Sequence, residues 1–145
     1  MKMREILFRG KRVDTGEWVE GFLSRGRYYG YKENSLQTAI DREEKGVMCT
    51  SVVKPETVGQ YTGLTDINGT KIFEGDIVSS SMFDFAVIEW DEEDAMFLCV
   101  YDETNTCNFG EIWGRELEVI SNIYDNEDLL YEAECLKDAK EVKNG

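Results

Sequence analysis

The sequence contains no histidine and a single proline. Without histidine, the usual Ser–His and Cys–His pairings of nucleophilic catalysis are impossible, and a general base would have to be a carboxylate, a lysine or a less common group. The chain also lacks a Walker-type phosphate loop and a G-x-G-x-x-G turn after a strand. These absences exclude many hydrolase mechanisms and leave no local signal for nucleotide binding. We therefore expect no catalytic residue and no cofactor.

Long apolar runs are missing as well. No run approaches the roughly 20 residues that a membrane-spanning helix needs, and residues 1–5 lack the apolar segment of a secretory signal. The four cysteines, Cys49, Cys99, Cys107 and Cys135, form no C-x-x-C pair and have no histidine to complete a mixed zinc site. We expect reduced thiols, no bound metal, no membrane contact and, by elimination, a cytoplasmic location.

The net charge of −14 is distributed unevenly. Residues 1–60 hold 11 Lys or Arg against 9 Asp or Glu, a balance of +2, and residues 61–145 hold 5 against 21, a balance of −16, which together give −14. Because binding to a phosphate backbone needs clustered cations, nucleic acid is disfavoured as a partner. Halves of different charge could attract one another between subunits, whereas the plainer interpretation is a set of solvated surfaces.

Short β-rich runs separated by polar turns predict a mainly β fold. Residues 5–13 and 17–23 flank a short Asp/Gly turn and predict a hairpin, whose buried face we expect to contain Phe8, Trp18 and Phe22. Gly10 and Gly21 interrupt these runs, which indicates bulges or close backbone approach. The first part of the chain is therefore expected to begin with a two-stranded unit.

The pattern weakens over residues 24–51. A third strand is possible at residues 27–31, and the polar residues 41–46 predict a turn or an exposed loop. Residues 47–53 form the next candidate strand, which ends before Pro55. This proline suits a boundary between two lobes.

The remaining runs predict a second set of strands and then a helix. Asn68-Gly69 is a tight-turn signal, and residues 83–90, 96–101 and 117–120 are typical of strands. Ile112-Trp113 also fits the β part. Strands at this spacing indicate a barrel or a sandwich. After Tyr124, capping residues and apolar residues at helical spacing predict a short amphipathic helix.

Two groups of side chains were candidates for a site. The acidic run of residues 91–94 could bind Ca²⁺ or Mg²⁺, although it lacks the spacing and the glycine of an EF-hand loop, so a solvated hairpin turn is favoured. Trp18, Tyr61 and Trp90 could line an aromatic groove for peptides. Core burial is favoured for Trp18 and Trp90, and Tyr61 is left open between the two interpretations.

Several segments, in the same order along the chain, resemble the YopX family. They are MREILFRGKR at residues 3–12, GEWVEG at 16–21, PETVGQYTGL at 55–64, IFEGDIV at 72–78 and VISNIY at 119–124. The resemblance implies a phage or prophage protein of a bacterial host cell. It also implies a two-lobed β fold with an SH3-like barrel that begins near Tyr61, a tendency to form homo-oligomers, and no established activity.

Together these observations predict a mainly β protein of three parts: an N-terminal β lobe at residues 1–56, an SH3-like barrel at 57–124, and a short C-terminal α-helix with a tail at 125–145. The candidate interaction surface consists of Arg9, Trp18, Gln60, Tyr61 and Asp76.

The expected function is that of a non-enzymatic phage accessory protein, which assembles with itself and binds a protein partner not identified by the sequence. One alternative is an acidic mimic of DNA that inhibits a host nucleic-acid-binding protein. Another is an enzyme that uses carboxylates without histidine, which only the number of acidic residues supports.

Overall fold

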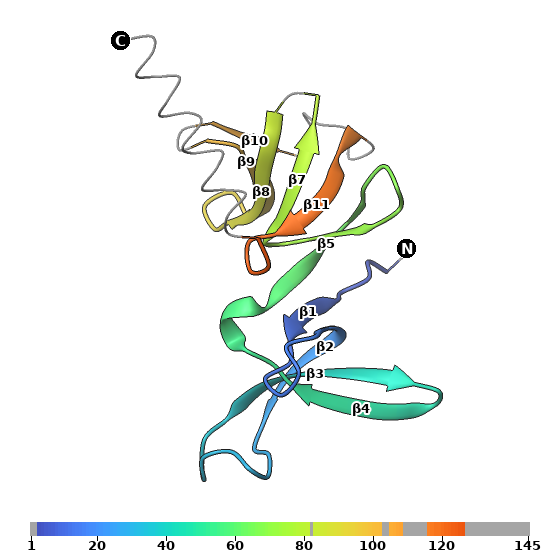
Figure 1. Ribbon diagram of the computed structural model, residues 1–145, viewed down its shortest axis with the longest axis vertical. Helices are drawn as coiled ribbons and strands as arrows, with labels where there is room; N and C mark the ends of the chain where they lie inside the picture. Colours follow the sequence, from blue (N-terminus) through green and yellow to red (C-terminus); the bar gives the residue numbers. More distant parts are fainter. Residues whose placement is uncertain (1–2, 82, 103–104, 109–115, 127–145) are drawn as a thin grey trace. The chain divides into compact units, whose positions relative to one another are not determined.

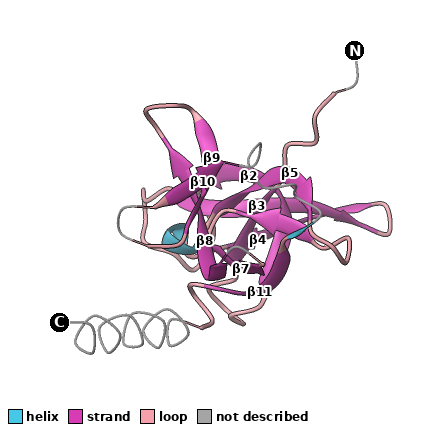
Figure 2. Ribbon diagram, turned by 90° about the horizontal axis from the view of Figure 1, so that it is seen from above, coloured by secondary structure: helices cyan, strands magenta, loops and turns pink. Residues whose placement is uncertain are grey.

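The computed structural model describes residues 3–81, 83–102, 105–108 and 116–126. The chain divides into two compact units, residues 1–63 and 64–145 (Figure 1). Strands make up most of the described residues, as the magenta ribbons of Figure 2 show. The prediction of a mainly β fold is therefore confirmed. The predicted helix and tail lie outside the described residues from residue 127 onward.

One sheet has the strand order β4-β3-β2-β1-β5-β6. Its strands are β1 (Phe8–Lys11), β2 (Trp18–Gly26), β3 (Gln37–Glu44), β4 (Val47–Val52), β5 (Gly59–Thr65) and β6 (Lys71–Phe73). A short 3-10 helix, Pro55–Thr57, precedes β5. β5 begins in the first unit, where Gly59 and Gln60 pair with β1, and it ends in the second.

The predicted N-terminal hairpin is confirmed. β1 and β2 pair antiparallel, with Phe8 opposite Gly21 and Lys11 opposite Trp18. Gly21 marks a close approach of backbones, because a Cβ at this position would lie 2.2 Å from the carbonyl oxygen of Asp41. Only glycine therefore fits between β2 and β3 without a shift of the backbone.

The region of residues 24–51 differs from the prediction. β3 continues through the polar residues to Glu44, and only Lys45 and Gly46 form the turn, both with positive φ. No strand forms at residues 27–31. β3 and β4 make a long hairpin (Figure 1). Because many of its residues are charged, the sequence lacks the alternation of apolar and polar residues by which a strand is usually predicted. The two-residue turn with positive φ at both positions is of the kind that closes tight hairpins.

The second unit contains a five-stranded antiparallel sheet in the order β10-β9-β8-β7-β11. The strands are β7 (Asp76–Ser80), β8 (Phe83–Asp91), β9 (Met96–Val100), β10 (Thr106–Asn108) and β11 (Glu118–Asn122). The strands predicted at residues 83–90, 96–101 and 117–120 are thus confirmed. Ile112-Trp113 lies outside the described residues.

Each unit has its own core. The core of the second unit is the larger, and its buried residues are Ile72, Val78, Phe83, Ala86, Ile88, Cys99, Cys107 and Leu117. Cys99 lies on β9 as a fully buried thiol within this core. The core of the first unit consists of Val19, Ile40 and Val53, with Phe8 and Val58 packed against it.

Candidate functional site

A basic–aromatic face, formed by Arg9, Lys11 and Trp18, lies on β1 and β2. The guanidinium carbon of Arg9 is 4.7 Å from the centroid of the Trp18 ring, and Nζ of Lys11 is 5.5 Å from it. Lys11 is directly opposite Trp18, and Arg9 is two residues away on the same strand, so the three side chains share one face of the sheet. Cations at such distances are attracted by the electron-rich face of the indole ring. The fold therefore brings Arg9 and Trp18 together.

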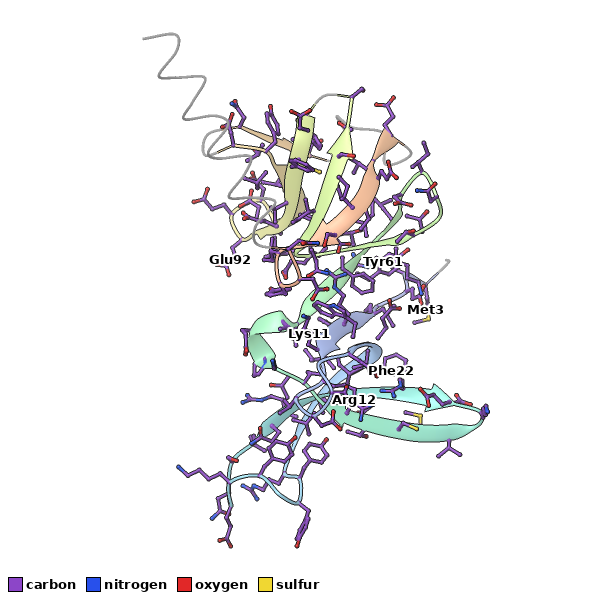
Figure 3. All side chains as sticks on the ribbon, viewed as in Figure 1. Met3, Lys11, Arg12, Phe22, Tyr61 and Glu92 are labelled. Carbon is purple, nitrogen blue, oxygen red and sulfur yellow. The ribbon has the colours of Figure 1, made fainter. Side chains whose placement is uncertain are left out.

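Gln60 and Tyr61 occupy opposite faces of β5. Phe8 is paired with Gln60, and Arg9 with Gly59, so Gln60 lies on the face away from Arg9 whereas Tyr61 lies on the same face as Arg9. Tyr61 is only 8% exposed, and its backbone N–H donates to the carbonyl of Leu7 at 2.8 Å. The question left open for Tyr61 is thus answered in favour of the core. Figure 3 labels this side chain on β5.

Asp76 is a buried residue of the second unit. It is 1% exposed, and its carboxylate accepts a hydrogen bond from the backbone N–H of Phe73 at 2.7 Å. This bond holds the turn between β6 and β7. The structure therefore gives Asp76 a local structural contact and leaves almost none of its surface to a partner.

Asp66 is a second buried carboxylate, which sequence reasoning did not single out. Its Oδ1 accepts from the N–H groups of Asn68 and Thr70, both at 2.8 Å, and its Oδ2 accepts from that of Val119 at 2.9 Å. Burial alone raises the pKa of Asp66, but the three backbone hydrogen bonds outweigh it, and the pKa is lowered from its ordinary value of 3.8. The available signal was an Asp two residues before Asn68-Gly69, since Asp often closes such turns onto its own backbone.

Trp90 is half-exposed at the end of β8. It is 45% exposed and makes an edge-to-face contact with Phe97, with ring centroids 4.9 Å apart. The core position predicted for Trp90 is therefore wrong. Ile88, two residues earlier, is fully buried, and the strand leaves the core as it reaches the acidic turn.

Asp91 ends β8, and the other residues of the acidic run, 92–94, lie in the turn between β8 and β9. Oδ1 of Asp91 accepts a hydrogen bond from the N–H of Glu93 at 3.1 Å, and both Glu93 and Glu92, which Figure 3 labels, are exposed. Within the described ranges, no group of three or more Cys, Asp or Glu side chains could hold a metal ion. The described geometry of the run is that of a solvated hairpin turn.

Two further titratable groups have shifted pKa values. Burial, with a smaller contribution from Cys107, raises the pKa of Cys99 to about 12, which leaves it a protonated thiol at neutral pH. Burial, followed by repulsion from Glu89, raises the pKa of Glu74 above its ordinary value of 4.5.

Large apolar side chains are exposed on the strands of the first unit. Phe22 on β2 is 63% exposed, and Val47 and Met48 on β4 are 62% and 61% exposed. The predicted burial of Phe22 is therefore wrong: the core side of β2 is taken by Val19 and Gly21, and Phe22 projects from the other face beside β3 (Figure 3). In the part of the chain that the structure describes, no helix is long and apolar enough to cross a membrane.

The fold and these surfaces define a mainly β protein with two compact units and exposed apolar side chains on its strands. The chain belongs to the YopX family, because the family profile, described as YopX protein, matches residues 7–131. The resemblance inferred from the sequence segments is thereby confirmed. A comparison with curated proteins found no match.

The fold is also similar to that of a solved structure. The crystal structure of protein EF1440 from Enterococcus faecalis superposes with a TM-score of 0.50 at 21% sequence identity, over 88% of this chain and 99% of that one. At this identity the likeness concerns the fold alone.

Proposed function

We propose that the chain is a phage or prophage accessory protein that assembles with copies of itself and binds another macromolecule, and that it acts by contact rather than by catalysis. Its setting would be the cytoplasm of a bacterial host cell. The proposal keeps the interpretation that the second sheet closes into a small SH3-like barrel.

The observation that supports this proposal best is the exposure of Phe22 on β2 and of Met48 on β4, two strands that flank β3 and present both side chains on the same face of the sheet. Apolar side chains that gather on one exposed face are typical of surfaces that are covered by another protein. The buried carboxylates of Asp66 and Asp76, in contrast, accept hydrogen bonds from the backbone. These two carboxylates therefore stabilise the fold, whereas the exposed apolar side chains are available for contact with another protein.

The basic–aromatic face supports a protein partner. Trp and Arg are enriched among the residues that contribute most to binding in protein interfaces. Arg9 and Trp18 already hold each other in a fixed geometry, which reduces the side-chain entropy lost on binding. The chemistry of this face favours a partner that offers carboxylates or an aromatic ring.

The assembly is tested by light scattering coupled to size-exclusion chromatography at several salt and protein concentrations. A mass of two or more chains is expected at high concentration. A strict monomer throughout would remove self-assembly from the proposal.

The partner is tested by affinity purification from lysogenic cells with the wild-type chain and with the Trp18→Ala variant, which should identify a protein that the wild type binds and the variant does not. Equal recovery by both would argue against the basic–aromatic face.

A second candidate function is an acidic mimic of nucleic acid. The exposed Glu92, Glu93 and Asp94, within the half that has a balance of 5 basic against 21 acidic residues, favour it. Capture of DNA-binding proteins from a host lysate at low salt, with release at high salt, would support mimicry. Capture that is insensitive to salt would contradict it.

A further inference from the structure

Among the described residues, the two sheets end in four edge strands, and β4 differs from the other three. β6 and β10 each have 3 residues, and β11 carries a bulge between Val119 and Ser121. β4 has 6 residues, no bulge in its pairing with β3, and no charged residue between Val47 and Val53. Natural proteins protect exposed edges with short strands, charges, prolines or bulges. β4 has none of these protections.

The backbone groups of β4 that face outward can be assigned from its hydrogen bonds. The carbonyl of Val52 accepts from the N–H of Val13 at 3.0 Å, on the side away from β3. Because the direction alternates along an antiparallel strand, the N–H and C=O groups of Thr50 and Met48 also face outward. Within the described part of the chain, no hydrogen bond reaches these four groups.

This arrangement is self-complementary. In an antiparallel pair of two β4 strands, Met48 of one copy can exchange both backbone hydrogen bonds with Thr50 of the other, and the reverse pair forms by symmetry. Cys49 then faces Cys49 of the second copy at the two-fold axis. Val47 of one copy lies opposite Ser51 of the other, so the paired stretch ends one residue before Val52. The outward carbonyl of Val52 already accepts a hydrogen bond from the N–H of Val13.

We propose that two copies of the chain associate through antiparallel pairing of β4 with β4, centred on Cys49. The inference rests on the self-assembly part of the proposed function and names its interface. The pairing satisfies the four outward groups of each β4 and covers the apolar side chain of Met48, which shares its sheet face with Phe22. It brings no charged side chain of the paired segment into the interface.

Oxidation across the axis gives a direct test. Directly opposed residues that exchange no hydrogen bonds have Cα atoms about 4.5 Å apart, within the range that a disulfide needs. The Cys135→Ser variant, treated with diamide, which takes up the two electrons and two protons of the thiol pair, should form a covalent dimer that Cys49→Ser abolishes. As a control, the triple variant Thr106→Cys, Cys49→Ser and Cys135→Ser carries an exposed cysteine on another edge strand and measures how much covalent dimer forms by random collision. Dimer yield in this control equal to that of Cys49 would overturn the proposal.

Proline substitution tests the backbone pairing independently. Thr50→Pro removes an outward N–H that the β3–β4 ladder does not use, and we expect it to raise the dimer dissociation constant about tenfold or more. Thr106→Pro is the matched control. Thr106 lies on edge strand β10, and its N–H also faces outward, because the neighbouring hydrogen-bonded position joins Tyr101 N–H to the carbonyl of Asn105. This variant should assemble like wild type.

The outcomes separate the two proposals. A multimer that Thr50→Pro leaves intact and that Cys49 does not cross-link would overturn the β4 interface and leave self-assembly standing. A monomeric wild type at every concentration would overturn both. A monomer whose β4 binds a different protein, with binding lost in Thr50→Pro, would overturn the second copy as the occupant. Thermal unfolding of both proline variants verifies that each remains folded, and Met48→Lys repeats the test without proline.

Discussion

The two units of this protein bury their apolar residues to different extents. The second unit has the larger core, which includes Ile72, Ile88 and Leu117, all fully buried. The first unit has a core of Val19, Ile40 and Val53, while Phe22, Val47 and Met48 remain exposed on its strands. Exposed apolar side chains occur in the second unit as well, where Ile67 is 63% and Trp90 45% exposed, so the two units differ in the size of their cores and not in the presence of exposed apolar surface.

The largest effect is expected when a side chain of the second unit's core is removed. Ile88→Ala is expected to lower the free energy of unfolding of the second unit by about 2–5 kcal/mol, because it removes a fully buried side chain and leaves a cavity. Urea denaturation measures the loss. Ile120→Ala, at a half-exposed position of β11, is the control and should change stability by no more than about 0.5 kcal/mol.

Loss of the Asp66 carboxylate should have the next largest effect. Asp66→Ala leaves three N–H donors without their acceptor and is expected to cost about 2–3 kcal/mol, whereas Asp66→Asn retains one acceptor oxygen and should cost less. The pKa of Asp66 is lowered in the folded state, so its contribution is present above the ordinary value of 3.8 and is lost as pH falls through the folded pKa. Urea denaturation from neutral to acid pH should show a shallower decline for Asp66→Asn. Parallel declines would contradict this role.

Gly21→Ala should damage the first unit. The added Cβ would meet the carbonyl oxygen of Asp41 at 2.2 Å, so β2 and β3 must separate, at a cost of about 1–3 kcal/mol. Amide exchange should accelerate across β2 and β3 while the second unit keeps its protection. Gly16→Ala is the control: its Cβ has open space, and only its positive φ of 74° is strained. An equal effect of both variants would show that the close approach is unimportant.

The smallest effect is expected for Glu74→Gln. Burial and repulsion from Glu89 raise the folded-state pKa of Glu74, so the ionised side chain destabilises the fold increasingly as pH rises from 4.5 through the folded pKa. The neutral glutamine should therefore raise the Tm slightly at neutral pH, with no gain below pH 4.5. Thermal melts at both pH values measure the difference. A gain of the same size in acid would exclude the charge as its cause.

The sequence predicted the second unit better than the first. On β8, Ala86 and Ile88 are buried whereas Glu89 is exposed, and on β9, which is apolar throughout, Cys99 is the buried residue, so the apolar content of these strands identified them even where the alternation of burial is incomplete. β3 was missed because Asp41 to Glu44 belong to a solvated hairpin, where strand pairing is fixed by the tight turn at Lys45-Gly46 rather than by burial. The pattern of apolar residues along a sequence identifies strands that have a buried face. It does not identify this hairpin, whose strand pairing is set by the turn.

The candidate site was predicted in part, for a similar reason. Strand alternation places Arg9 and Lys11 on one face, but their contact with Trp18 depends on the β1–β2 register, which the turn determines. Gln60 lies on the opposite face of the sheet. Asp76 accepts a hydrogen bond from the backbone N–H of Phe73, which only the folded turn brings within reach. The edge of β4 became visible only with the complete strand order.

Concentration-dependent amide exchange tests most directly whether the first unit supplies the contact between copies. The N–H groups of Val47, Cys49 and Ser51 face β3 and should be protected at every concentration, whereas those of Met48 and Thr50 should gain protection only as the protein assembles. Met48 and Thr50 amides that exchange freely in a sample shown by light scattering to be multimeric would contradict the assignment of contact to this edge.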